Sequence, residues 1–70
     1  MSKYIEFDRK LLWHVERGVG TFAYLVAEMY EPAMELDTGS GPDRVVDRRL
    51  QALRKADLIR YSLGRWERVR

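Results

Sequence analysis

Apolar residues recur every three or four positions through most of the first 56 residues, a spacing typical of helices with one buried face. From about Asp8 the pattern predicts a first helix that ends near Arg17, where Gly18 suits the position after a helix. Its apolar arc consists of Phe7, Leu11, Leu12 and Val15. Trp13 lies outside that arc, so the helical phase predicts that it is exposed among charged side chains.

A second apolar stretch follows a short connection, with Thr21 as the expected N-cap. The predicted buried face consists of Phe22, Leu25, Val26, Met29 and Tyr30. Pro32 has no N–H and its ring crowds the carbonyl of Glu28, so the helix should end or kink there. Because Ala33 and Leu36 stay in phase with the apolar face, we expect a kinked or restarted turn through Leu36.

The third predicted helix, residues 42–56, begins with proline at its first position, where the missing N–H costs nothing. One face carries Val46, Leu50 and Leu53, and the opposite face carries Arg44, Arg48, Gln51 and Lys55. Neighbours in this set are three or four residues apart, about one turn, and three of the four are cations, which repel one another. A surface that tolerates such repulsion is typical of an anion site, and a helical ridge of this shape fits the major groove of DNA.

The last residues predict a β-hairpin of two short strands, 58–62 and 65–69, after Asp57 ends the helix in the left-handed region. With Leu63-Gly64 as a two-residue loop, Tyr61 faces Trp66 and Arg60 faces Glu67. Trp66 and Val69 then point to opposite faces. This predicts either a bulge near Gly64 or an outward-facing Val69.

Composition restricts the class of protein. Seventy residues form a single domain, 1–70, and the absence of cysteine excludes disulfides and thiolate metal sites. The longest apolar run is residues 22–27, which predicts no membrane span, and we expect a cytoplasmic protein. Charge is uneven: residues 1–40 carry four Lys/Arg and seven Asp/Glu, whereas residues 41–70 carry nine and four. The basic half holds the helical ridge, which favours a nucleic-acid partner.

The stretch Leu50 to Tyr61 resembles the junction between recognition helix and wing in MarR-like, ArsR-like and PadR-like repressors, written L-x-x-L-x-x-x-G-L-I. Asp57 stands where that family has glycine, and the following Gly64-Arg65-Trp66 is similar to the family's wing. The resemblance covers about 45 residues. It implies an α+β winged helix-turn-helix of three helices and a C-terminal two-stranded β-hairpin wing, with 42–56 as recognition helix and 58–70 as wing.

The residues expected to bind DNA come from this helix and wing: Arg44, Asp47, Arg48, Gln51, Lys55, Arg60, Arg65 and Arg68. Arginine, glutamine and aspartate can bond base edges, and lysine can hold a phosphate. The alternatives are a solvated helix face and a charged edge strand that guards against aggregation. We expect Arg49, at the border of the buried face, to pair with an acidic residue of the first or second helix. Glu31, Glu35 and Asp37 would oppose phosphate if they lay near the recognition helix.

Trp13 and Tyr24 are candidates for a protein interface, because aromatic residues often anchor one. Trp13 either anchors a second subunit, as in a homodimer that reads paired half-sites, or is covered by the segment Tyr4-Ile5. His14 is the only histidine, so we expect no metal site and read it as a residue at the edge of the core. Since no nucleophile–base pair is evident, we expect neither an enzyme nor a cofactor.

Two functions follow as expectations. The first is a small cytoplasmic winged-helix protein that binds double-stranded DNA, acting by site occupancy as a transcriptional regulator or a phage or plasmid accessory factor. The second is a winged helix that binds protein instead, through Trp13, Tyr24 and the acidic face of the second helix. The two differ in their response to salt, because DNA binding through several cations weakens steeply as salt rises.

Overall fold

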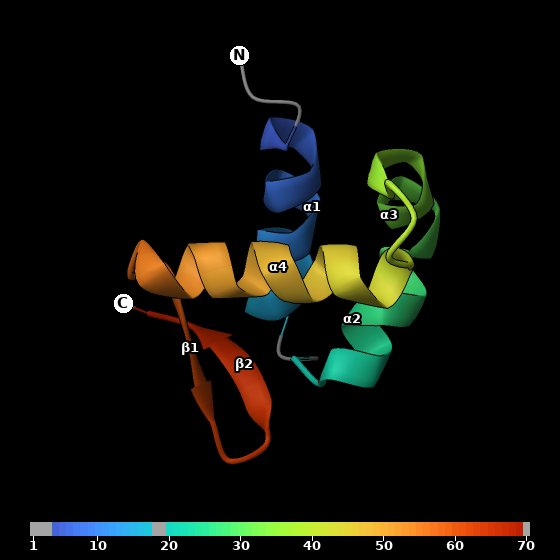
Figure 1. The fold of residues 1–70 in the computed structure, drawn as a ribbon. Coiled ribbons are helices and arrows are strands. Elements are labelled where there is room, and N and C mark those ends of the chain that lie inside the picture. Colours follow the sequence, from blue (N-terminus) through green and yellow to red (C-terminus); the bar gives the residue numbers. More distant parts are fainter. Residues whose placement is uncertain (1–3, 18–19, 70) are drawn as a thin grey trace.

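The computed structural model describes residues 4–17 and 20–69. In chain order, the elements of these residues are α1 (Ile5–Glu16), α2 (Phe22–Glu28), α3 (Tyr30–Leu36), α4 (Pro42–Lys55), β1 (Ile59–Ser62) and β2 (Arg65–Arg68). Helix α4 lies across the front of the molecule, α1 stands behind it, and the hairpin hangs below one end (Figure 1). The chain is thus α+β with a C-terminal antiparallel hairpin, a layout compatible with a winged helix.

One hydrophobic core joins all four helices to the hairpin. Among the described residues, its buried members are Phe7, Leu11, Val15, Leu25, Met29, Ala33, Val45, Val46, Leu50, Leu53, Ile59 and Trp66. On α1 they recur every four residues. On α4, Val46, Leu50 and Leu53 recur every three or four residues, with Val45 beside them, as a helical face requires. The apolar arc of α1 and the face of α4 that carries Val46 are therefore confirmed as core.

The described residues form four helices where the sequence predicted three, because the second helix breaks at Met29 (φ −101°, ψ 13°). The expected break was at Pro32. By restarting at Tyr30, the chain places Pro32 in the first turn of α3, where backbone N–H groups have no intrahelical acceptor and proline is tolerated. The prediction that Tyr30 is buried is wrong. Its side chain is 50% exposed because Leu25, Met29 and Ala33 carry the inner face.

Helix α4 begins at the predicted Pro42 and ends at Lys55, one residue before the predicted Ala56. Gly41 precedes Pro42 with a φ of 98°, which only glycine adopts readily. At the other end Asp57 is left-handed (φ 62°), the N–H of Leu58 donates to the carbonyl of Leu53 at 3.1 Å, and that of Asp57 to Arg54 at 3.0 Å. These two bonds form a Schellman motif, which turns the chain from α4 into the hairpin.

The hairpin has the predicted register: Tyr61 pairs with Trp66 and Arg60 with Glu67 across a loop of Leu63 and Gly64. Both loop residues have positive φ (51° and 83°), as a type I′ turn requires. The register is continuous over the four pairs of β1 and β2, so this segment contains no bulge. Val69 is 39% exposed, which confirms the alternative of an outward-facing side chain.

Gly20, just before α2, packs against the middle of β2. Its carbonyl accepts a hydrogen bond from the N–H of Trp66 at 2.8 Å. A Cβ at position 20 would lie 1.9 Å from the carbonyl oxygen of Trp66, so only glycine fits there. This contact fastens the connection between α1 and α2 to the hairpin. None of the helices in residues 4–17 and 20–69 is long and apolar enough to cross a membrane.

Candidate nucleic-acid interface

The outer face of α4 carries the polar ridge that the sequence predicted. Arg44, Arg48 and Lys55 are exposed, and Gln51 between them is half-buried. The three cations lie opposite the buried Val46, Leu50 and Leu53 on the helix, and all three are exposed. Helix α4 itself lies at the front of the molecule in Figure 1. The guanidinium of Arg48 donates to the hydroxyl of Ser40 at 3.4 Å, a long bond between exposed groups. The ridge therefore presents positive charge to solvent.

Arg54 extends this ridge along one edge. Arg54 was not among the residues predicted to bind DNA, although its spacing of three residues from Gln51 places the two side by side on a helix. Its Nε donates to the amide oxygen of Gln51 at 3.0 Å, so that oxygen is already engaged. The NH₂ group of Gln51 takes no part in this bond, but the bond fixes its orientation.

A hollow of about 350 Å³ separates this edge of α4 from the hairpin. Its lining comes from α4, from the start of α2 and from both strands: Phe22, Asp47, Gln51, Arg54, Tyr61 and Trp66. Tyr61 is 57% exposed and meets the buried Trp66 edge to face, with ring centroids 5.1 Å apart. Asp47, a predicted DNA-binding residue, thus lines a hollow that also contains aromatic side chains. Sequence reasoning missed the contribution of Phe22, which comes from a distant part of the chain.

The cations of the hairpin are engaged within the fold. The Nε of Arg60 lies 2.6 Å from a carboxylate oxygen of Glu67, its cross-strand neighbour. Arg68 shares a face with Ile59 and Trp66, and its guanidinium reaches Glu16 of α1 at 3.4 Å. Arg65 is exposed on β2. Arg60 and Arg68 thus each have a carboxylate partner within the fold, so reaching DNA would require them to leave it.

Arg49 has the structural role that the sequence predicted. Two of its nitrogens donate to the carboxylate of Asp8 on α1, at 2.9 and 2.7 Å, and its guanidinium lies over the ring of Tyr4, 4.3 Å from the centroid. The hydrogen bond to Asp8 raises the pKa of Arg49 further above its ordinary value. This pair locks α1 to the inner side of α4, and it leaves the outer side of α4 unobstructed.

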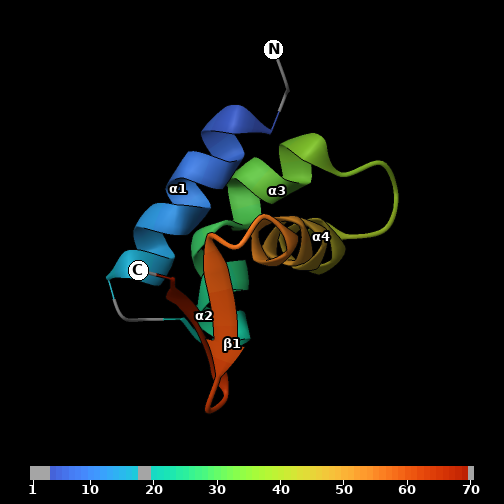
Figure 2. The same cartoon turned by 90° about the vertical axis from the view of Figure 1, so that its left-hand side faces the viewer.

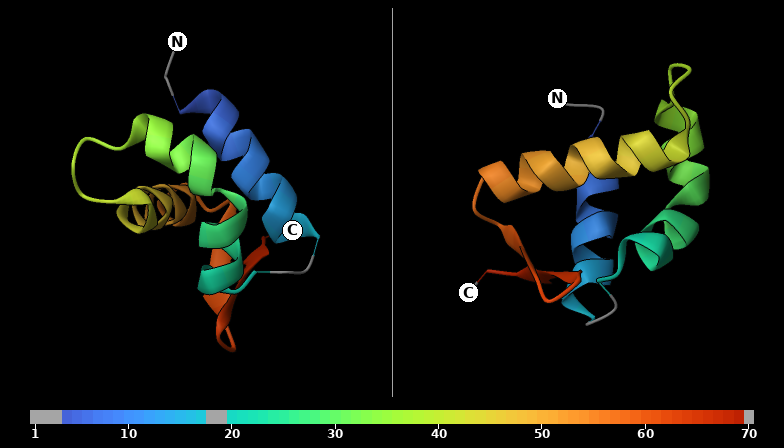
Figure 3. Two further views of the ribbon diagram at one scale, coloured as in Figure 1. Left: turned by 90° about the vertical axis from the view of Figure 1, so that its right-hand side faces the viewer. Right: turned by 60° about the horizontal axis from the view of Figure 1, so that its bottom comes forward.

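Asp37, one of the acidic residues expected to oppose phosphate, is engaged in hydrogen bonds just before α4. The carboxylate of Asp37 accepts hydrogen bonds from the N–H groups of Gly39, Ser40 and Gly41, each 2.9 Å long. Those bonds, that from Gly41 first and that from Gly39 next, lower the pKa of Asp37. The carboxylate thus orders the loop between α3 and α4 (Figure 3, left), and its effect on phosphate stays a prediction.

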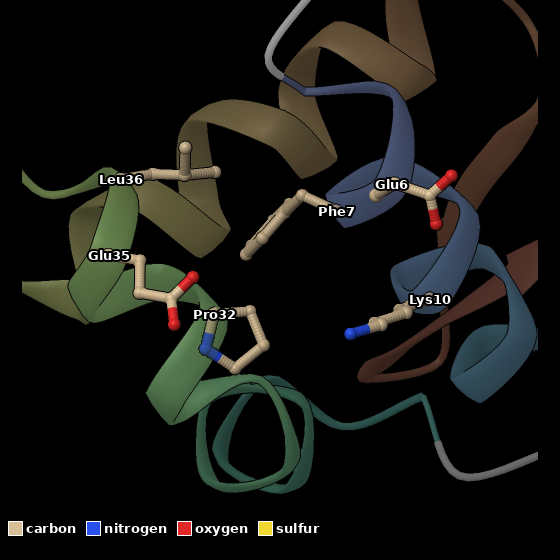
Figure 4. A pocket seen from close by; sticks show the side chains of 6 residues that line it. All are labelled: Glu6, Phe7, Lys10, Pro32, Glu35 and Leu36. Carbon is tan, nitrogen blue, oxygen red and sulfur yellow. The ribbon is translucent and has the colours of Figure 1, made fainter.

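Glu35 faces a different part of the molecule. It lines a small hollow of about 120 Å³ between α1 and α3, together with Glu6 and Lys10 of α1 and the apolar Phe7, Pro32 and Leu36 (Figure 4). Lys10 and the two carboxylates have opposite charges at this site. Glu35 is therefore directed toward α1, away from the outer face of α4.

Trp13 is 50% exposed, as its helical phase predicts. The guanidinium of Arg17 lies 4.4 Å from the centroid of its ring. His14, half-buried beside it, touches Trp13 and Tyr24 edge to face, at 5.0 and 6.1 Å between ring centroids. Tyr4 lies against Arg49 instead, so the alternative that Tyr4 covers Trp13 is wrong.

Comparison with family models, curated proteins and solved structures finds no match to this chain. Among the described residues, no group of three or more His, Asp or Glu side chains could hold a metal ion.

Proposed function

We propose that this protein is a winged-helix DNA-binding protein that acts by occupying its site, as a transcriptional regulator or an accessory factor of a phage or plasmid. Helix α4 would enter the major groove, with the hairpin beside the flanking backbone. The observation that carries this proposal is the outer face of α4, where Arg44, Arg48 and Lys55 are all exposed. The three cations lie along one 14-residue helix, and the major groove of DNA is wide enough to admit an α-helix.

The charges around the ridge support the same proposal. Arg49, the half-buried cation on the inner side of the helix, is paired with Asp8. The outward cations Arg44, Arg48 and Lys55 lack a carboxylate partner within 4 Å among the described residues. Positive charge is thus concentrated on one side of α4. Association with DNA would release counterions from phosphate, which is the main source of affinity for such a surface.

Because Arg60 and Arg68 of the hairpin are already in ion pairs, we expect the hairpin to contribute less to DNA binding than the ridge on α4. Arg60 and Arg68 would have to leave Glu67 and Glu16 to reach phosphate. Arg65 and the fully exposed Leu63 lie at or beside the turn, where they would meet the backbone or the minor groove first. The proposal therefore assigns the ridge most of the affinity and the turn of the hairpin the flanking contacts.

The experiment compares Arg48→Ala with a matched control, Arg9→Ala, by fluorescence anisotropy with a mixed-sequence duplex at several salt concentrations. Both changes remove one exposed cation, but Arg9 lies on α1 beside Glu6. We expect Arg48→Ala to weaken binding about tenfold and to lower the salt slope by about one, while Arg9→Ala has little effect. Circular dichroism checks that both variants fold.

Equal affinity of wild type and Arg48→Ala, or absence of binding at low salt, would contradict the proposal. The second candidate, a winged helix that binds protein, is favoured by one observation, the half-exposed indole of Trp13 on a face remote from α4. That function predicts no steep dependence on salt and no effect of Arg48→Ala.

A further inference from the structure

Helix α1 presents a straight stripe of four exposed side chains to solvent: Glu6, Lys10, Trp13 and Arg17. Their spacings of four, three and four residues place them in one line along the helix. The buried side chains Phe7, Leu11 and Val15 point to the core. Asp8, which binds Arg49 of α4, projects from roughly the opposite side of α1, so the stripe faces away from α4. In Figure 2, where α4 is seen end-on, the two helices lie on opposite sides of the molecule.

The order of residues in this stripe makes it complementary to itself. When a second α1 runs antiparallel, with the twofold axis between positions 10 and 13, Glu6 meets Arg17 of the second copy. Lys10 then meets the indole of Trp13. The twofold repeats both contacts, giving two ion pairs and two cation–π pairs along a single helix–helix seam. In a parallel arrangement, each charged side chain would face the identical side chain of the second copy.

The side chains already have conformations that suit this pairing. The guanidinium carbon of Arg17 lies over the Trp13 ring, 4.4 Å from its centroid, and a guanidinium on an aromatic ring can still donate N–H groups to a carboxylate. Glu6 contacts Arg9 at 3.3 Å, but both side chains are 72% exposed, so this ion pair is weak and easily exchanged. A mostly apolar hollow of about 300 Å³, lined by Glu6, Arg9, Lys10, Trp13 and His14, lies beside the stripe.

We propose that the stripe on α1 binds a second copy of this chain, as an antiparallel helix pair with Glu6 opposite Arg17 and Lys10 opposite Trp13. The mixture of both signs does not suit a polyanion, and a single large apolar side chain does not suit a lipid surface. The stripe is complementary in charge to the same stripe of another chain, which identifies a second copy as its partner. Because one helix pair buries less surface than a standard interface, the dimer is weak and its population depends on protein concentration. The proposal is independent of DNA binding.

The first test is a charge-swap series, measured by sedimentation equilibrium of the intact chain without DNA, at protein concentrations up to about 1 mM. We expect Glu6→Arg and Arg17→Glu each to weaken self-association about tenfold, because each replaces two attractive pairs by two repulsive ones. The double variant carries both changes and should recover the affinity of the wild type to within about threefold. Circular dichroism and thermal unfolding check the fold of each variant.

A chain that stays monomeric over this range would overturn the proposal. So would a dimer that is unaffected by the single changes, or one that the double change fails to restore. Binding of DNA plays no part in these readouts, so a failure here is distinct from a failure of the proposed function.

The second test uses cysteines, which the wild-type chain lacks. In Glu6→Cys/Arg17→Cys, the two cysteines of one chain are about 16 Å apart along α1, too far to form a disulfide. We expect oxidation to give a covalent dimer in this variant, and a much lower yield in either single variant. Efficient cross-linking of Glu6→Cys alone would place like residues together and overturn the antiparallel arrangement.

Discussion

At the scale of single residues, the tightest constraint in the molecule is Gly20. Its carbonyl binds the N–H of Trp66, and the space where a Cβ would stand is filled by the carbonyl of the same residue. No local sequence pattern could reveal this, because the two residues are far apart in the chain. Sequence reasoning could read Gly20 only as part of a short connection.

We expect Gly20→Ala to lower the free energy of unfolding by about 1–3 kcal/mol, since backbone of β2 or of the connection must move to admit the methyl group. Urea denaturation followed by tryptophan fluorescence measures the change. Gly39→Ala is the control, because position 39 has no neighbouring atom within 4 Å and only its positive φ is strained. A larger loss in Gly39→Ala than in Gly20→Ala would contradict this account.

The carboxylate of Asp37 provides a prediction on pH. Its pKa is lowered in the folded protein by the N–H groups of Gly41 and Gly39, in that order, from an ordinary value of 3.8. The stabilisation from these bonds is therefore complete above pH 3.8 and is lost as the pH falls through the lower, folded-state pKa. We expect wild type to have a higher melting temperature than Asp37→Asn at pH 7, with the gap closing in stronger acid.

Thermal melts of both proteins from pH 7 to pH 2, followed by circular dichroism, check this. The remaining carboxylates are common to the two chains, so their titration cancels in the difference. A gap that stays constant over the whole range would show that the charge of Asp37 does not hold the loop.

Arg49 shows what sequence could establish at this scale. Its place at the border of the buried face indicated an acidic partner on the first or second helix, and the structure identifies Asp8. Sequence reasoning could also identify the partner of Arg60, but not that of Arg68. The register of the hairpin predicted Glu67 for Arg60, but Glu16, the partner of Arg68, depends on how α1 packs against β2.

At the scale of elements, the largest difference from expectation is the break at Met29. Sequence reasoning identified Pro32 as the cause of a break and located the break at the proline itself. The chain instead breaks three residues earlier, since proline suits the first turn of a new helix better than the end of an old one. The restart at Tyr30 also explains why a residue in phase with the apolar face is exposed.

The end of α4 gives a prediction for an element boundary. Asp57 holds the left-handed position of a Schellman motif, where glycine has no steric cost. We expect Asp57→Gly to raise the free energy of unfolding by about 0.5–1 kcal/mol and Asp57→Ala to lower it. Chemical denaturation at constant m-value measures both. If glycine destabilised the protein as much as alanine does, the side chain of Asp57 would have a role beyond ending the helix.

At the scale of the whole molecule, the order of helices and hairpin followed from the sequence, apart from the division of the second helix into α2 and α3. The relative placement of the elements did not. Periodicity revealed the inner face of each helix, and the two-residue loop gave the hairpin register. The hollow between Phe22, Tyr61 and α4 needed the three-dimensional packing of segments that no spacing rule relates. The candidate ridge on α4 was predictable because all its members belong to one helix.

The positions of α1 and α4 within the molecule have a consequence for how two copies would work together. With the stripe of α1 on one side and the ridge of α4 on the other, a back-to-back pair would hold its two ridges outward, in opposing directions (Figure 2). In such a pair, the two ridges could not both enter successive major-groove turns of one straight duplex. A dimer that binds paired half-sites contacts DNA in that way. The dimer would instead bridge two separate lengths of DNA, or the two arms of a DNA loop.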